Sequence, residues 1–160
     1  MTDHAQENFE ELLLNLSQTP NQIEKLIRNL PLDSLKAKSS DEFSILESIC
    51  HLRDIELEGY SVRIRRILNE DKPSLPDIDG ARLAIERDYN NQDHAAALES
   101  FGQERKENID LLSELDDTDL RRTGEFQGIG ETSLTRLLEM MWEHDEGHLE
   151  ELQRLRRLTD

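Results

Sequence analysis

The chain has 160 residues, of which 35% are hydrophobic and 34% charged, and its formal net charge is −17. This length suits one domain with one hydrophobic core, so we predict a single domain over residues 1–160. So acidic a surface repels phosphate backbones, which argues against a nucleic-acid partner.

Cysteine content and hydropathy predict the compartment. The chain has one cysteine, Cys50, so it cannot form an internal disulfide, which fits a reducing compartment. No apolar run approaches the roughly 20 residues that a membrane span needs. The acidic N-terminal segment also lacks the basic start and apolar centre of a signal peptide. We therefore expect a cytoplasmic protein with no membrane partner.

Apolar residues recur at helical spacing through most of the chain, and the good helix formers Leu, Glu and Arg dominate. In chain order we predict helices over residues 3–30, 44–69, 81–89, 93–115 and 133–158. Pro20 predicts a bend or restart in the first helix. Ser44 and Glu47 have capping-box spacing at the start of the second. Because no segment alternates convincingly as a strand, the prediction is an all-α four-helix bundle without a sheet.

The segment before the last helix, residues 116–132, contains Gly124, Gly128 and Gly130. A connection this long is uncommon in a bundle and often serves as a lid or the wall of a site. Its GIGE sequence is not a dinucleotide motif, since no strand is predicted before it. Gly59 and Gly147 fall inside predicted helices, where each costs about 1 kcal/mol relative to Ala. We expect both at surface positions.

The last predicted helix contains two histidines, His144 and His148, in the segment WEHDEGHLEELQ. At about 100° per residue, both lie on the apolar stripe of this helix, and residues i and i+4 share one side. Two inward-facing imidazoles need polar partners, because unpaired buried polar groups are costly. The spacing is consistent with a metal bound by both and equally with hydrogen bonds to nearby carboxylates. Among the other histidines, His51 is the best further candidate, at the border of an apolar helix face. The stripe itself consists of Leu134, Leu137, Leu138, Met141, Leu149, Leu152 and Leu155.

Two motifs, FSILESICHLRDIE and later GETSLTRLLEMMWEHDEGHLEEL, together resemble the DinB-like superfamily, also called the YfiT-like metal-dependent hydrolases. The resemblance implies a four-helix bundle that holds one divalent transition metal on His51, His144 and His148. Three imidazoles suit zinc, nickel, iron or manganese. Phe43 replaces the more usual Trp and Glu151 the more usual Gln, which leaves the substrate class open.

The resemblance also implies a function. A metal with three protein ligands keeps a free position and activates a bound water or thiol. We expect a metal-dependent enzyme with a small-molecule substrate, either a low-molecular-weight thiol S-transferase or a hydrolase, and favour S-transfer. The alternative is a non-catalytic, metal-stabilised dimeric bundle that acts in a stress response or as an interaction module. We expect a homodimer in either case, with Met140 and Leu158 available off the main stripe.

Three further side chains have two interpretations each. Asp145 is either a catalytic base or orienter beside the metal, or the partner of an arginine in an ion pair. Arg105 either extends to solvent from an apolar face, which is the favoured interpretation, or reaches an anionic substrate. Cys50 is predicted to be a small core residue rather than a reactive thiol.

Overall fold

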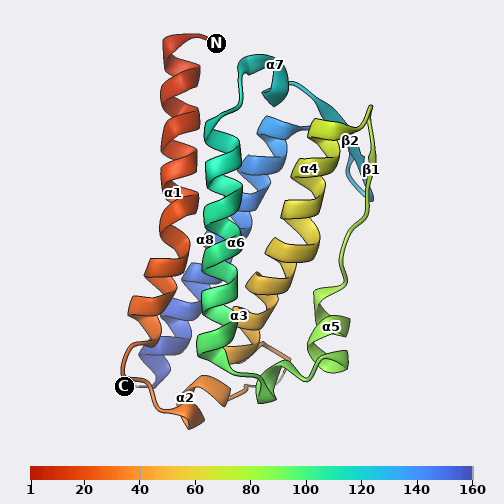
Figure 1. Cartoon of the computed structure of the whole chain (residues 1–160). Helices are drawn as coiled ribbons and strands as arrows, with labels where there is room; N and C mark the ends of the chain where they lie inside the picture. The colour runs from red at the N-terminus through yellow and green to blue at the C-terminus, as the bar shows by residue number, and fades with distance from the viewer. Residues whose placement is uncertain (40, 160) are drawn as a thin grey trace.

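Four long helices form a bundle in the computed structural model, which describes residues 1–39 and 41–159 (Figure 1). They are α1 (Asp3–Ile27), a second helix made of α3 (Ile45–Asp54), η1 (Ile55–Tyr60) and α4 (Ser61–Asn69), then α6 (His94–Ser113) and α8 (Leu134–Leu158). The predicted class, a mainly helical four-helix bundle, is confirmed. Among the described residues, no helix is long and apolar enough to cross a membrane.

The helix starts agree with the local sequence signals. The Ser44 side chain accepts a hydrogen bond from the Glu47 amide, and the Glu47 carboxylate accepts one from the Ser44 amide, both at 3.0 Å. The predicted capping box is therefore confirmed. The side chains of Asp93 and Ser133 accept hydrogen bonds from backbone amides in the first turns of α6 and α8. The expected restart at Pro20 is wrong, because α1 continues through this residue to Ile27.

The connections follow from the helix directions. In Figure 1, α1 and α8 run one way along the bundle, whereas α3–α4 and α6 run the other way. Because α4 and α6 are parallel, the chain between them has to return along the outside of the bundle. It does so through β1 (Ser74–Leu75), α5 (Gly80–Glu86) and the turn η2 (Tyr89–Asn91). The short helices α2 (Leu32–Lys36) and α7 (Asp117–Leu120) lie at opposite ends of the bundle.

A small sheet corrects the prediction that no strand is present. β2 (Thr123–Phe126) pairs antiparallel with β3 (Gly130–Ser133) and parallel with β1. The turn between β2 and β3 uses the positive φ angles of Gly128 (80°) and Gly130 (107°), which favour glycine. Residues 116–132 are thus a helical turn and a hairpin rather than a loop. The strands have two to four residues each, too few to show a clear alternation in the sequence.

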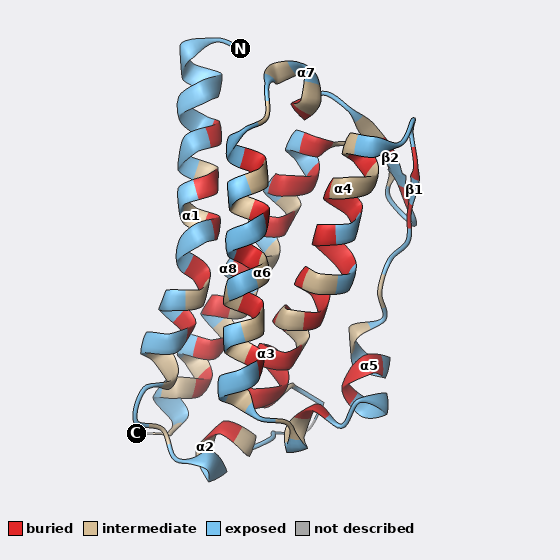
Figure 2. Cartoon of the chain, in the orientation of Figure 1, coloured by how far each residue is buried: buried red, intermediate tan, exposed pale blue. Residues whose placement is uncertain are grey.

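The apolar side chains form two clusters, here called the upper and lower cores after their places in Figure 1, and Figure 2 shows them as buried positions on the inward helix faces. On α1, α6 and α8, polar residues interrupt the apolar stripe between the two cores. The upper core includes Leu16, Leu112 and Met141, and the lower core includes Ile23, Phe101 and Leu149. The buried polar residues between them include Thr19, Arg105 and Asp145.

Candidate metal centre

The three histidines singled out from the sequence lie together in the folded chain. His51 comes from α3, and His144 and His148 come from α8. One ring nitrogen of each lies within 4.8 Å of the others. The Nε2 atoms of His51 and His144 are 3.2 Å apart, and the ring centroids of His144 and His148 are 4.5 Å apart. Two helices far apart in sequence thus direct three imidazoles at one point.

Burial keeps these imidazoles neutral. The pKa of His51 falls to about 4, first through burial and then through the charge of His148, against the opposing charge of Asp54. The pKa of His144 falls to about 2, first through burial and then through the charges of both other histidines. Burial also lowers the pKa of His148, against the opposing charge of Asp145. At neutral pH all three are therefore unprotonated on one nitrogen, the form that binds metal.

Hydrogen bonding within the cluster is incomplete. Among the described residues, the buried Nδ1 atoms of His51 and His148 have no hydrogen-bond partner. Glu151 Oε2 is 3.7 Å from Nδ1 of His148, just beyond hydrogen-bond distance. A direct hydrogen bond between His51 and His144 would occupy one nitrogen of each ring and leave the third imidazole without a partner. A buried polar group without a partner is costly, so these nitrogens favour a ligand such as a metal ion.

A divalent transition metal fits this donor set. With metal–nitrogen distances of roughly 2.0–2.1 Å, two Nε2 atoms 3.2 Å apart subtend an angle of about 100°, close to tetrahedral or octahedral values. Imidazole nitrogen suits zinc, nickel and iron, and binds manganese more weakly. The residues present thus fit the metal that the resemblance implies, and their role as ligands remains a prediction.

Close packing fixes the position of His51. The Phe43 ring lies 5.3 Å from its ring centroid. On another side, a Cβ atom added to Gly80 would be only 2.6 Å from Cε1 of His51. Only glycine therefore fits at the start of α5 without displacing the imidazole. The crossover between α4 and α6 thus contributes directly to the cluster.

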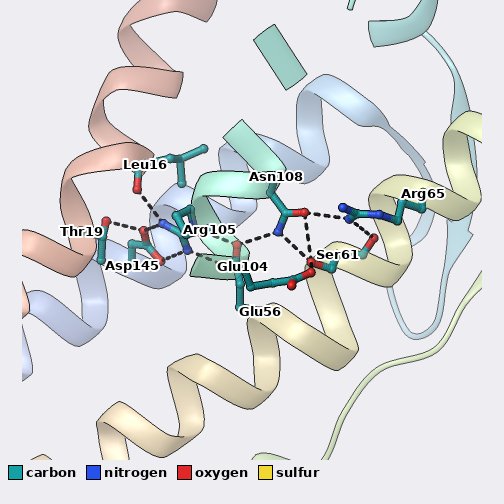
Figure 3. Close-up of polar contacts among 9 residues, drawn as sticks. All are labelled: Leu16, Thr19, Glu56, Ser61, Arg65, Glu104, Arg105, Asn108 and Asp145. Carbon is teal, nitrogen blue, oxygen red and sulfur yellow. Dashed lines mark hydrogen bonds and ion pairs between the residues drawn. The ribbon is translucent and has the colours of Figure 1, made fainter. Parts of the chain in front are cut away.

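A buried ion-pair network, shown in Figure 3, includes Asp145, the residue that follows His144 on α8. Arg105, only 2% exposed, donates two hydrogen bonds to Glu56 (both 2.9 Å) and two to Asp145 (2.6 and 3.1 Å). Its fifth bond, at 2.8 Å, goes to the carbonyl oxygen of Leu16. Pro20 explains this bond, because proline has no N–H to donate to the carbonyl four residues earlier. The proline inside α1 therefore supplies an acceptor for a buried arginine.

This network decides the interpretation of Arg105. The favoured expectation, extension to solvent, is wrong because the side chain is buried. The alternative, an anionic substrate, is also wrong, since all five donors already bond to the protein.

Asp145 makes the ion pair with an arginine that was one of its two interpretations. It is 1% exposed, and its two oxygens accept hydrogen bonds from Arg105, with a further one from Thr19 at 2.5 Å. No ring nitrogen of the histidines is among its hydrogen-bond partners in the described chain. A catalytic role for Asp145 remains a prediction with its own test.

Several residues around the cluster were missed from the sequence. The π-helical turn η1 places Glu56 and Tyr60 inside the bundle, and π-helical turns occur frequently at functional sites. The predicted surface position of Gly59 is wrong, because this glycine is buried. Gly147 is exposed, as predicted. Cys50 is fully buried, and burial raises the pKa of its thiol to about 11, which confirms a core residue.

A sequence profile described as DinB superfamily matches residues 15–152 of this chain. The chain belongs to the DinB superfamily. The matched range includes all three histidines and every residue of the ion-pair network. No curated protein matches the chain. A solved structure of YfiT from Bacillus subtilis superposes with a TM-score of 0.89 at 17% sequence identity, over 99% of this chain and 90% of YfiT. That structure is described as a "probable metal-dependent hydrolase with an unusual four-helix bundle topology". The likeness to YfiT confirms the DinB-like bundle fold.

Proposed function

We propose that this DinB-superfamily chain is a metal-dependent enzyme that binds one divalent transition metal through His51, His144 and His148. The observation that supports this most directly is the convergence of three neutral, half-buried imidazoles whose hydrogen bonding is incomplete. Two hydrogen-bonded core histidines, the alternative from the sequence, would not leave buried Nδ1 atoms without partners.

The metal would act as a Lewis acid and lower the pKa of a bound water or thiol, which supplies a nucleophile at neutral pH. The chain contributes the rest. Its neutral imidazoles would hold the metal. The ring centroids of Phe43 and His51 are 5.3 Å apart, and those of Tyr60 and His144 are 6.1 Å apart, so apolar rings pack against the cluster. Glu151 is the carboxylate nearest to Nδ1 of His148, and such a carboxylate commonly orients a metal-bound imidazole.

For the reaction we favour transfer of a low-molecular-weight thiol to a small electrophile, with hydrolysis as the second possibility. The family resemblance supports S-transfer, and the description of YfiT supports hydrolysis. The same metal site serves either reaction, by activating the thiol for S-transfer or a water for hydrolysis. The substrate is a small molecule in both cases, and the net charge of −17 argues against nucleic acid.

A second candidate is a non-catalytic, metal-stabilised bundle that dimerises. One observation favours it: two cavities, of about 600 and 450 Å³, lie elsewhere on the bundle, and none of the three histidines lines them. Leu158 is 70% exposed and available for a dimer contact, whereas Met140 packs partly against the upper core. The homodimer itself remains a prediction, which light scattering at high protein concentration tests.

Metal stoichiometry and turnover separate these candidates. Elemental analysis of protein purified without a histidine tag should give close to one transition metal per chain. His144→Ala and His148→Ala should lose it, whereas His94→Ala, on α6 outside the cluster, should retain it. Metal retained by all variants would contradict the ligand assignment. A panel of cellular thiols with a generic electrophile should then react faster with metal-loaded than with metal-free protein. Equal rates across the panel would favour the non-catalytic bundle.

A further inference from the structure

A second buried arginine, Arg63, lies close to the cluster on α4. Its side chain is 4% exposed, and its Cζ atom lies 5.2 Å from the centroid of the Tyr60 ring and 4.5 Å from that of Phe126. The Tyr60 ring in turn lies 6.1 Å from the ring of His144. One aromatic ring therefore separates the guanidinium from the three-histidine cluster.

Unlike Arg105, Arg63 has few hydrogen-bond partners. Its Nε and Nη2 atoms share one acceptor, the carbonyl oxygen of Pro76, at 3.4 and 3.2 Å. Its nearest carboxylate, Asp77, is 3.8 Å from Nη2 and is 67% exposed. Within residues 1–39 and 41–159, no acceptor lies at hydrogen-bond distance from Nη1. Nη1 is not among the fully buried atoms without a partner, so it keeps contact with solvent. A cation that is otherwise buried and has so weak a counterion is costly unless something else binds it.

The surroundings of Arg63 leave room for its guanidinium. A Cβ atom added to Gly59 would lie 3.2 Å from Nη1 and 3.3 Å from Cδ1 of Ile78, so a larger residue would press on the guanidinium. Gly59, inside the second helix, therefore leaves space for the guanidinium of Arg63. Burial lowers the pKa of Arg63, against the opposing effects of Tyr60 and Asp77, which agrees with the small amount of negative charge nearby.

We infer that Arg63 binds an anionic group, a carboxylate, of the small molecule whose reactive end binds at the three-histidine site. The inference rests on the proposed function, since it assigns the substrate class of that site. Guanidinium matches a carboxylate with two parallel hydrogen bonds, one from each of two nitrogens. Pro76 occupies the Nε side of Arg63, so the edge formed by Nη1 and the second hydrogen of Nη2 is available for them. The competing explanation is purely structural: Arg63 ties the crossover at Pro76 to the bundle and needs no ligand.

Thiols that differ only in charge distinguish these explanations. The protein is loaded with cobalt(II) and titrated with ω-mercaptocarboxylates of increasing chain length and with the matching amides, followed by thiolate-to-metal absorption. We expect the best acid to bind roughly 10-fold more tightly than its amide. Arg63→Gln should abolish this preference and keep the metal. Arg66→Gln, on the same helix but paired with Glu70 at the surface, should leave it unchanged.

A second variant should change the preference for the acid in the opposite direction. Asp77→Asn removes the weak competing carboxylate from an exposed position, so the preference for the acid should rise roughly two- to fivefold. If Arg63→Gln fails to fold, this variant decides, and an unchanged preference overturns the inference. Equal binding of acid and amide by wild-type protein overturns it as well.

Failure of the proposed function gives a different result. In that case no thiol produces the metal absorption in any variant. Calorimetry of the metal-free protein with plain alkyl carboxylates and their amides then tests Arg63 alone. A carboxylate preference that Arg63→Gln removes supports the anion site without the metal chemistry. No preference there overturns the inference.

Discussion

One added methyl group at Gly80 should disturb the metal centre from outside the bundle. In Gly80→Ala the new Cβ atom would lie 2.6 Å from Cε1 of His51. An ordinary carbon–carbon contact needs about 3.5 Å, so the imidazole or the start of α5 must move by about 0.9 Å. Metal sites tolerate shifts of only about 0.2 Å in ligand distance. We therefore expect roughly 10- to 100-fold weaker metal binding, the usual effect of disturbing a ligand's support.

Gly147→Ala is the matched control. This glycine lies within α8 near His148, but nothing lies within 4 Å of the position of its added Cβ atom. The substitution should stabilise the protein by about 1 kcal/mol through helix propensity and leave metal affinity unchanged. Metal dissociation constants come from competition with a chromophoric chelator, and stability from urea unfolding of the metal-free protein. Wild-type metal affinity in Gly80→Ala would refute the argument that Gly80 positions His51.

Three further predictions concern the interior. Arg105→Met leaves the buried carboxylates of Glu56 and Asp145 without a counterion, so we expect a loss of about 3–5 kcal/mol in urea unfolding; a loss below about 1 kcal/mol would contradict the network's role. The folded-state pKa values of His51 (about 4) and His144 (about 2) lie below the unfolded value of about 6.5, so the unfolded chain binds more protons in acid. The metal-free protein should therefore lose up to about 1.4 kcal/mol per pH unit for each of these histidines below pH 6.5, and His144→Ala should show a shallower pH dependence. Asp145→Asn should lower the free energy of unfolding, because it weakens the ion pair with Arg105, and it should leave the metal content unchanged. Slower turnover at unchanged stability would instead support Asp145 as a base.

The features that were predictable from the sequence depend on neighbours close in the chain. The capping box of Ser44 and Glu47 needs only four residues, and the inward direction of His144 and His148 follows from helical periodicity. His51 was less secure, because it lies at the border of an apolar face, and the family resemblance supplied the assignment.

The features that were missed depend on contacts between distant segments. The sheet joins residues 74–75, 123–126 and 130–133, and no single segment is long enough to reveal it. The carbonyl of Leu16 is free because of Pro20, but its partner Arg105 lies far along the chain. Gly80 and Gly59 carry no signal of the side chains that press against them. Composition alone could not show that Arg105 has acceptors for all its donors whereas Arg63 does not.

The central claim is that three imidazoles hold one metal ion, and a metal-loaded crystal structure tests it most directly. Data collected on both sides of the metal's absorption edge identify the ion without reference to the protein atoms. We predict one anomalous peak per chain, roughly 2.0–2.1 Å from one ring nitrogen each of His51, His144 and His148. A fully loaded crystal with no peak among these imidazoles, or with its metal bound elsewhere on the chain, would contradict the claim.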